Sequence, residues 1–204
     1  MSYNFTISVE QNQFSQDVEK LRGSLDLIPE AMTNPAFVVV SGLPGTGKTF
    51  FCSKLAEQLP FCIIETDAMR KTLFSSPDYS AVESTRLFAA CHSLIEELLG
   101  KGVPLIFDAT NLSERNREHF YRISDKARAR LILVRVEAPS EVVYQRLRAR
   151  SDGRTEPGDK SDADWDVYCR MEPRVDKIQR NHFAVDTSRD IAPVIEKIMR
   201  VINH

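Results

Sequence analysis

The sequence has few glycines, few cysteines, no long hydrophobic run and almost no excess of charge. Its 204 residues include 8 glycines and 4 cysteines, and 27 basic residues nearly balance 29 acidic ones. The net charge of -2 excludes a globally basic nucleic-acid coat protein, although it permits a local basic groove. Hydrophobic residues make up 42% and charged residues 27%, which is the composition of an ordinary globular chain and excludes extensive disorder.

Targeting and crosslinking patterns are also missing. Residues 1–5 (MSYNF) lack the positive charge and apolar run of a secretory signal, and no apolar stretch approaches the roughly 18 residues that span a bilayer. Cys52, Cys62, Cys91 and Cys169 form no C-x-x-C pair, and the histidines show no metal-ligand spacing. We therefore expect reduced, mostly buried thiols and a cytoplasmic protein.

The length predicts one domain with an appendage, since a typical domain has about 150 residues. Residues 1–35 are predicted to be a helical extension, because apolar residues recur there at steps of three and four. From residue 36 to 204, short apolar runs alternate with helical segments, which is typical of a parallel sheet covered on both faces and predicts an α/β fold. The apolar residues of the extension are Phe14, Val18, Leu21, Leu25 and Ile28. The expected strands are 36–41, 61–65, 104–108, 131–136 and 183–186.

Several helices are expected to begin at a capping residue. Ser113, Ser140 and Asp190 each precede a helical segment and are predicted N-caps. A further helix is predicted to start at Ser161 or Asp162, after residues 151–161, which are polar and rich in turn formers. We predict a lid over about residues 150–164.

Three of the eight glycines fall within six residues and belong to a complete G-x-x-x-x-G-K-[ST] motif between an expected strand and an expected helix. Glycines let successive backbone N–H groups point at phosphate oxygens, and the helix adds its positive end. Lys48 is expected to reach the β- and γ-phosphates, and Thr49 to ligate Mg²⁺. The motif predicts binding of a nucleoside triphosphate with Mg²⁺. It consists of Gly42, Leu43, Pro44, Gly45, Thr46, Gly47, Lys48 and Thr49.

Other P-loop classes fit less well. No D-x-x-G or N-K-x-D follows the motif, which disfavours a GTPase, and the third strand ends Phe107-Asp108-Ala109 without an acidic pair, which disfavours a ring-forming motor. A small kinase-like architecture remains.

Carboxylates follow two of the expected strands. Asp67 is predicted to accept the proton of an acceptor hydroxyl, and Arg70, one turn later, to hold an anionic substrate group. Asp108 is the expected carboxylate that holds Mg²⁺ through water, and Thr110 and Asn111 are candidates for substrate contact. The alternatives are that Asp67 and Asp108 only cap helices and that Asn111 only forms a turn.

Arginines near the expected lid are candidates for neutralising charge on the transferring phosphoryl group. Arg146 and Arg150 share a helix face, whereas Arg148 points elsewhere. The alternative is a solvated basic helix face. Weaker candidates are Arg115, Arg117 and Arg154, then Tyr79 for the acceptor pocket, and Thr187 and Ser188 for the base or ribose.

The segments GLPGTGKT, ETDAMRKTLF, LIFDATNLSERNR, VRVEAPSEVVYQRLRAR, SDADWDVY and FAVDTS together resemble the AAA-domain P-loop kinase-like family. Its relatives include polynucleotide 5′-kinase domains, zeta-toxin-like kinases and chloramphenicol phosphotransferase. The resemblance covers about residues 36–200. It implies strand order 2-3-1-4-5, ATP as donor, a lid after the fourth strand, Asp67 with Arg70 at the acceptor, and Arg146 with Arg150 on the lid.

We therefore predict a kinase that transfers the γ-phosphoryl group of ATP to a hydroxyl of a small molecule or of a nucleic-acid 5′ end. Lys48, Asp67, Arg146 and Arg150 are the expected catalytic residues, and Thr49 with Asp108 the expected metal ligands. Two alternatives stay open: a nucleotide-binding switch or adaptor, and a simple ATPase.

Overall fold

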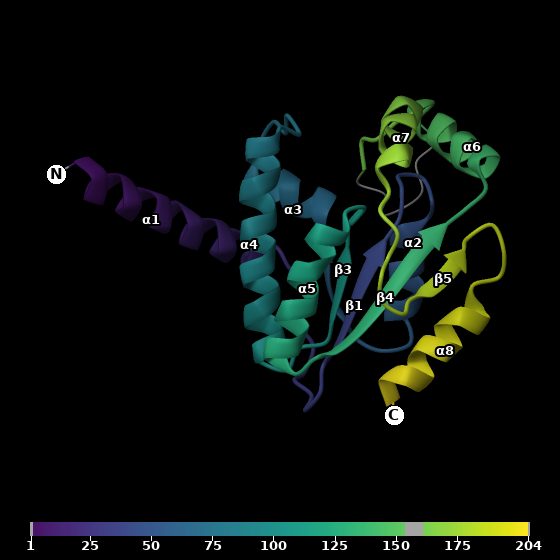
Figure 1. The fold of residues 1–204 in the computed structure, drawn as a ribbon, viewed down its shortest axis with the longest axis horizontal. Helices are drawn as coiled ribbons and strands as arrows, with labels where there is room; N and C mark the ends of the chain where they lie inside the picture. Colours follow the sequence, from purple (N-terminus) through teal and green to yellow (C-terminus); the bar gives the residue numbers. More distant parts are fainter. Residues whose placement is uncertain (1, 154–160, 204) are drawn as a thin grey trace.

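A five-stranded parallel sheet lies at the centre of the computed structural model, which describes residues 2–153 and 161–203 (Figure 1). The strand order is β2-β3-β1-β4-β5, so the predicted α/β fold and the implied strand order are both confirmed. The strands are β1 (Ala36–Ser41), β2 (Cys62–Glu65), β3 (Leu105–Asp108), β4 (Arg130–Glu137) and β5 (Phe183–Asp186).

Both faces of the sheet are buried, because alternate side chains of its central strands enter two separate hydrophobic clusters. In β1, Phe37 and Val39 pack on one side, while Val38 and Val40 pack on the other. The first face is covered by α1 (Ser2–Gly23), α3 (Thr66–Leu73), α4 (Ala81–Gly100) and α5 (Glu114–Ala127), and the second by α2 (Lys48–Ala56) and α8 (Ala192–Asn203).

The remaining helices lie over the carboxyl end of the sheet. They are α6 (Ser140–Ser151), α7 (Trp165–Met171) and the short η1 (Glu172–Arg174). Val143 and Leu147 of α6 form a third cluster with Tyr168 of α7, and Leu43 packs against it. The predicted lid begins in α6 and resumes before α7, but residues 154–160 lie outside the part that the structure describes.

The N-terminal helix ends earlier than its apolar spacing suggests. The backbone N–H and hydroxyl of Ser24 both donate to the carbonyl oxygen of Leu21, so α1 stops at Gly23. Ile28 lies beyond the helix and is exposed, whereas Val18 and Leu21 join the core. Only the C-terminal part of α1 therefore packs on the body, and in Figure 1 its N-terminal part projects away from the sheet.

Two of the predicted helix starts need correction. Helix α6 already includes Ser140, so Pro139 occupies the N-cap position there. Ser113 occupies the N-cap position of α5 as predicted, although its side chain forms no capping hydrogen bond. Helix α7 begins later than predicted, because Asp164 accepts the N–H of Val167 and caps it. Asp190 does bind the first N–H of α8, that of Ala192.

None of the helices in the described ranges has the length and apolar character needed to cross a membrane.

Candidate active site

The phosphate-binding loop joins β1 to α2, and its glycines sit where a side chain has no room. Gly45 and Gly47 have φ values of 76° and 88°, in the left-handed region that favours glycine. A Cβ on Gly42 would lie 2.3 Å from the carbonyl oxygen of Val136, and one on Gly45 would lie 2.8 Å from Cγ of Leu147. The loop is therefore shaped as much by β4 and α6 as by its own sequence.

Lys48 and Thr49 begin α2 and point toward the centre of the loop. The Lys48 ammonium donates to the carbonyl oxygen of Leu43, 3.1 Å away, which keeps this cation over the loop. The Thr49 hydroxyl donates to Oδ2 of Asp108 at 2.8 Å. Asp108 ends β3 next to β1, where it is in register with Val40, so the motif and this carboxylate meet at one end of the sheet.

Asp108 is a buried carboxylate. Burial raises its pKa, and the nearby charge of Asp67 raises it further, while Lys48 and the hydrogen bond from Thr49 lower it. A hydroxyl and a carboxylate oxygen are hard ligands of the kind that Mg²⁺ prefers. The described residues contain no cluster of three or more His, Cys, Asp or Glu side chains that could hold a metal. The Thr49–Asp108 pair thus offers two oxygen atoms that could bind Mg²⁺.

Asp67 lies beside this pair, in the first turn of α3. Glu65, which ends β2, is in register with Asp108, and the Thr66 hydroxyl donates to the backbone carbonyl of Asp108 at 3.3 Å. The half-buried Asp67 is close enough to act electrostatically on Asp108. Two carboxylates and the phosphate loop thus share one edge of the sheet, as expected for a ligand crevice in an open α/β sheet.

Arg70, which the sequence analysis expected to hold an anionic substrate group, is paired with another side chain of the protein. Its guanidinium is buried and forms an ion pair with Glu83 of α4, donates to the Ser84 hydroxyl at 3.4 Å, and lies 4.8 Å from the centre of the Tyr79 ring. Glu83 neutralises its charge, so an anionic substrate group would have to compete with a buried carboxylate. The local sequence gave no signal for this, because Glu83 lies 13 residues away on another helix.

Arg146 forms hydrogen bonds to the phosphate loop and to Thr187, the residue that follows β5. Its Nη1 donates to the Thr187 hydroxyl at 2.8 Å and to the carbonyl oxygen of Gly45 at 3.4 Å, and Nη2 donates to the backbone carbonyl of Thr187. The Thr187 hydroxyl in turn donates to the carbonyl oxygen of Thr46 at 2.6 Å. Arg150, one turn later, donates to the carbonyl oxygen of Ala163. Arg146 thus contacts the loop directly, while Arg150 holds the end of the predicted lid.

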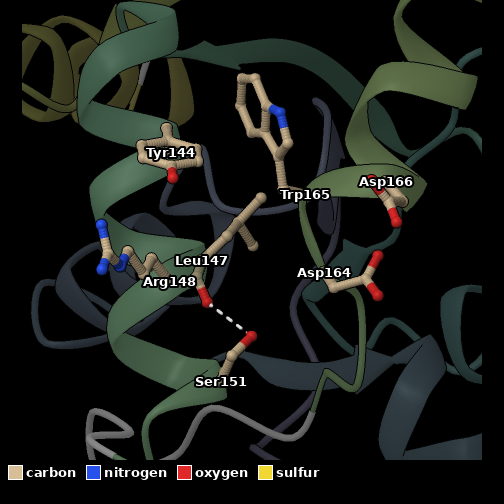
Figure 2. Close-up of a pocket in the computed structure, with 7 residues that line it drawn as sticks. All are labelled: Tyr144, Leu147, Arg148, Ser151, Asp164, Trp165 and Asp166. Carbon is tan, nitrogen blue, oxygen red and sulfur yellow. Dashed lines mark hydrogen bonds between the residues drawn. The ribbon is translucent and has the colours of Figure 1, made fainter.

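A groove of about 230 Å³ lies between α6 and the start of α7. Figure 2 shows Arg148 on the α6 side of this groove and Asp164 and Asp166 across from it. Arg148 shares this face with positions four before and three after it, whereas Arg146 and Arg150 lie on another. The groove is lined by Tyr144, Leu147, Arg148, Ser151, Asp164, Trp165 and Asp166.

Three other candidates have structural partners. The side-chain amide of Asn111 donates to the carbonyl oxygen of Val40 at 2.6 Å, and the backbone carbonyl of Asn111 accepts from the Ser41 hydroxyl and from Arg117. The backbone carbonyl of Thr110 accepts the N–H of Gly42. Arg117 is 1% exposed and also donates to Glu114, so it is a buried brace rather than a phosphate ligand. These residues hold β1, β3 and α5 together beneath the site.

The last candidates lie at the rim. Tyr79 is 48% exposed, and its hydroxyl donates to Asp162, which also pairs with Lys71. Burial and the hydrogen bond to Asp162 raise the pKa of Tyr79 to about 12. Arg115 and Ser188 are exposed, and Arg154 lies outside the described residues. All four cysteines are free, and three are buried while Cys169 is exposed.

Comparison with known proteins shows that residues 37–176 match a family model described as an AAA domain. Kti12 from Chaetomium thermophilum in complex with ADP-AlF3 has 20% identity and a TM-score of 0.64, covering 81% of this chain and 98% of that chain. A gluconokinase from Sinorhizobium meliloti 1021 has 19% identity and a TM-score of 0.55, covering 83% and 92%. The Mycobacterium tuberculosis APS kinase CysC has 12% identity and a TM-score of 0.58, covering 84% and 99%. These likenesses show the fold. No curated protein matches the chain.

Proposed function

Because this chain belongs to the AAA-domain family, we propose that it is an ATP-dependent phosphotransferase that moves the γ-phosphoryl group to a hydroxyl of a small molecule or a nucleic-acid 5′ end. One observation carries the proposal: Asp67 lies beside the Thr49–Asp108 pair at the edge of the sheet that bears the phosphate loop. A donor site and a candidate base thus face a common crevice.

The donor half consists of the loop and the start of α2. Backbone N–H groups of the loop and the ammonium of Lys48 would bind the phosphates, for which Lys48 would leave the carbonyl oxygen of Leu43. Thr49 and Asp108 would hold Mg²⁺ together with the nucleotide. The ion would supply positive charge to the β- and γ-phosphate oxygens when bound.

The acceptor half consists of Asp67 and the arginines. The acceptor oxygen attacks the γ-phosphorus, the bond from that phosphorus to the ADP oxygen breaks, and the hydroxyl proton passes to the Asp67 carboxylate. Arg146 would leave Thr187 and Gly45, and Arg150 the carbonyl oxygen of Ala163, to stabilise the charge on the phosphoryl group as it transfers. Arg70, neutralised by Glu83, keeps α3 in place instead of binding the acceptor.

Two of the solved structures with this fold carry kinase names, a gluconokinase and an APS kinase, which supports phosphoryl transfer here without naming the acceptor. A nucleotide switch or adaptor would need the phosphate loop but no carboxylate at Asp67. A simple ATPase would release phosphate at the same rate with or without an acceptor. The position of Asp67 beside the donor site favours the phosphotransferase over these two alternatives.

The test is a transfer assay with γ-labelled ATP and four acceptors: a DNA oligonucleotide with a 5′-hydroxyl end, adenosine, glucosamine and glycerol. We expect label in at least one acceptor, and we expect Lys48→Ala to reduce transfer by about 100-fold or more, which is typical for loss of one charge-stabilising group. Lys54→Ala is the matched control, because Lys54 lies on the same helix but pairs with Glu57 at the surface. Full activity of Lys48→Ala would overturn the donor assignment.

A further inference from the structure

We propose that Asp17 of α1 is a positioning residue for the acceptor side of the site, acting through Arg86 and the first turns of α4. The inference rests on the proposed function for what the site does. It concerns a helix that precedes the matched family region, which begins at residue 37. A continuous set of contacts runs from α1 through α4 to α3.

The first link joins α1 to α4. Arg86 donates from Nε and Nη2 to the two carboxylate oxygens of Asp17, at 2.5 and 2.7 Å, and the Gln13 amide donates to the same carboxylate at 3.0 Å. Asp17 is only 1% exposed. Burial alone would raise the pKa of Asp17, but the hydrogen bonds from Arg86 and Gln13 lower it overall. A two-pronged bond of this kind fixes direction as well as distance.

The second link joins the start of α4 to the middle of α3 and to the residue that follows it. The Arg86 guanidinium lies 5.2 Å from the centre of the ring of Phe74, the residue that follows α3. One turn earlier on α4, Glu83 forms the buried ion pair with Arg70 and accepts the N–H of Asp78 at 2.9 Å. Contacts that fix the position of the beginning of α4 therefore also fix the position of Arg70, which is one turn from Asp67.

A third link reaches α3 directly from the end of α1. The hydroxyl of Ser24, just past α1, lies 3.8 Å from the sulfur of Met69, two residues from Asp67. Val18 and Leu21 are buried in the same cluster as Met69 and Leu87. The C-terminal part of α1 thus packs against the two helices that form the acceptor side.

A second ion pair between α1 and α4 provides the comparison that separates positioning from general stability. Arg22 pairs with Glu97, and these side chains are 38% and 28% exposed, whereas in the first pair Arg86 is 39% exposed and Asp17 only 1%. Glu97 lies 11 residues after Arg86, which is about 16 Å along the helix. Loss of either pair should loosen α1, while the pair at Asp17 lies next to the contacts of Arg86 with Phe74 and of Glu83 with Arg70, and the Arg22 pair lies away from them on α4.

The experiment compares Asp17→Asn and Arg86→Lys with Arg22→Gln by hydrogen–deuterium exchange. Arg86→Lys keeps a positive charge beside Asp17, so it tests the pair even if Asp17→Asn folds poorly. We expect faster exchange over residues 66–80 in the first two variants and unchanged exchange there in Arg22→Gln. Unchanged exchange over 66–80 in both Asp17→Asn and Arg86→Lys, or an equal increase in Arg22→Gln, would overturn the proposal.

Kinetics give the functional readout, with whichever of the four acceptors above is phosphorylated fastest. Asp17→Asn should raise KM for the acceptor several-fold and leave KM for ATP unchanged, whereas a merely destabilised enzyme would lose active protein and keep both constants. If KM for ATP rises equally, Asp17 does not act on the acceptor side. If wild-type protein phosphorylates no acceptor, the proposed function fails and this functional role fails with it, while the exchange data still report whether Asp17 holds α3.

Discussion

Gly45 is fixed by two constraints at once: its backbone lies in the left-handed region, and Leu147 of α6 fills the space where a side chain would point. We predict that Gly45→Ala weakens ATP binding by at least about tenfold, since left-handed backbone costs an alanine about 1–2 kcal/mol and the contact with Leu147 adds to this. Calorimetric titration with ATP and Mg²⁺ measures the effect.

Gly100→Ala is the matched control for this prediction, because Gly100 ends α4 with no atom within 4 Å of the added Cβ. It should bind ATP like the wild type. Equal affinity of Gly45→Ala and wild-type protein would show that the loop tolerates a side chain there and that its shape is set elsewhere.

Residues whose role depends on a contiguous motif could be predicted from the sequence, and those whose role depends on distant partners could not. The phosphate loop has its full signature within eight residues. Arg117 and Arg70 look like free cations in the sequence. The structure pairs Arg70 with Glu83 and places Arg117 against the carbonyl oxygen of Asp176, 59 residues away. The spacing of residues within a short segment does not predict contacts between residues so far apart in the chain.

At the scale of elements, strands were predicted better than helix ends. Each strand is centred on a short apolar run, and β1 and β3 are buried along their whole length, so the strand limits lie close to a change in composition. Helix starts depend on which of several polar residues offers an oxygen to the first N–H groups. Asp164 caps α7 although Ser161 and Asp162 precede it, and the sequence alone does not rank such neighbours.

The packing of α4 on α5 should depend on pH. His92 of α4 is half-buried, stacks on His119 of α5 with ring centres 5.2 Å apart, and touches the edge of Phe120. Burial, and then the charge of His119, lowers the pKa of His92 from 6.5 to about 4. Between these values the unfolded chain binds the proton more readily, so stability should fall as the pH drops from 6.5 toward 4.

We predict that His92→Phe reduces this loss, because phenylalanine keeps the aromatic packing without a titrating nitrogen. Thermal unfolding at pH 7.0, 5.5 and 4.5 provides the measurement. His182→Gln is the control, since it also removes a histidine, but one that directly precedes β5 and lies outside the packing of α4 on α5, so the loss should stay as in the wild type. A His92→Phe profile as steep as that of the wild type would assign the acid sensitivity to other groups.

At the scale of the whole molecule, the parallel sheet gathers the ends of three strands on one edge. The loop after β1, Asp108 at the end of β3 and Asp67 after β2 come from positions far apart in the chain. The strand order that the family resemblance implied accounts for this meeting, and the family match over residues 37–176 confirms the resemblance. No sequence motif or family resemblance indicated that α1 packs against α3 and α4, because the matched region begins only at residue 37.

The central claim is that Asp67 and the phosphate loop form one phosphoryl-transfer site, and Asp67→Asn tests it most directly. The measurement follows γ-labelled ATP into the four acceptors for wild type and Asp67→Asn, with ATP affinity determined for both. We predict that the variant binds ATP like the wild type and transfers at least about 100-fold more slowly, as expected for loss of a general base. Transfer at the wild-type rate by Asp67→Asn, or release of labelled phosphate by wild type regardless of acceptor, would contradict the account.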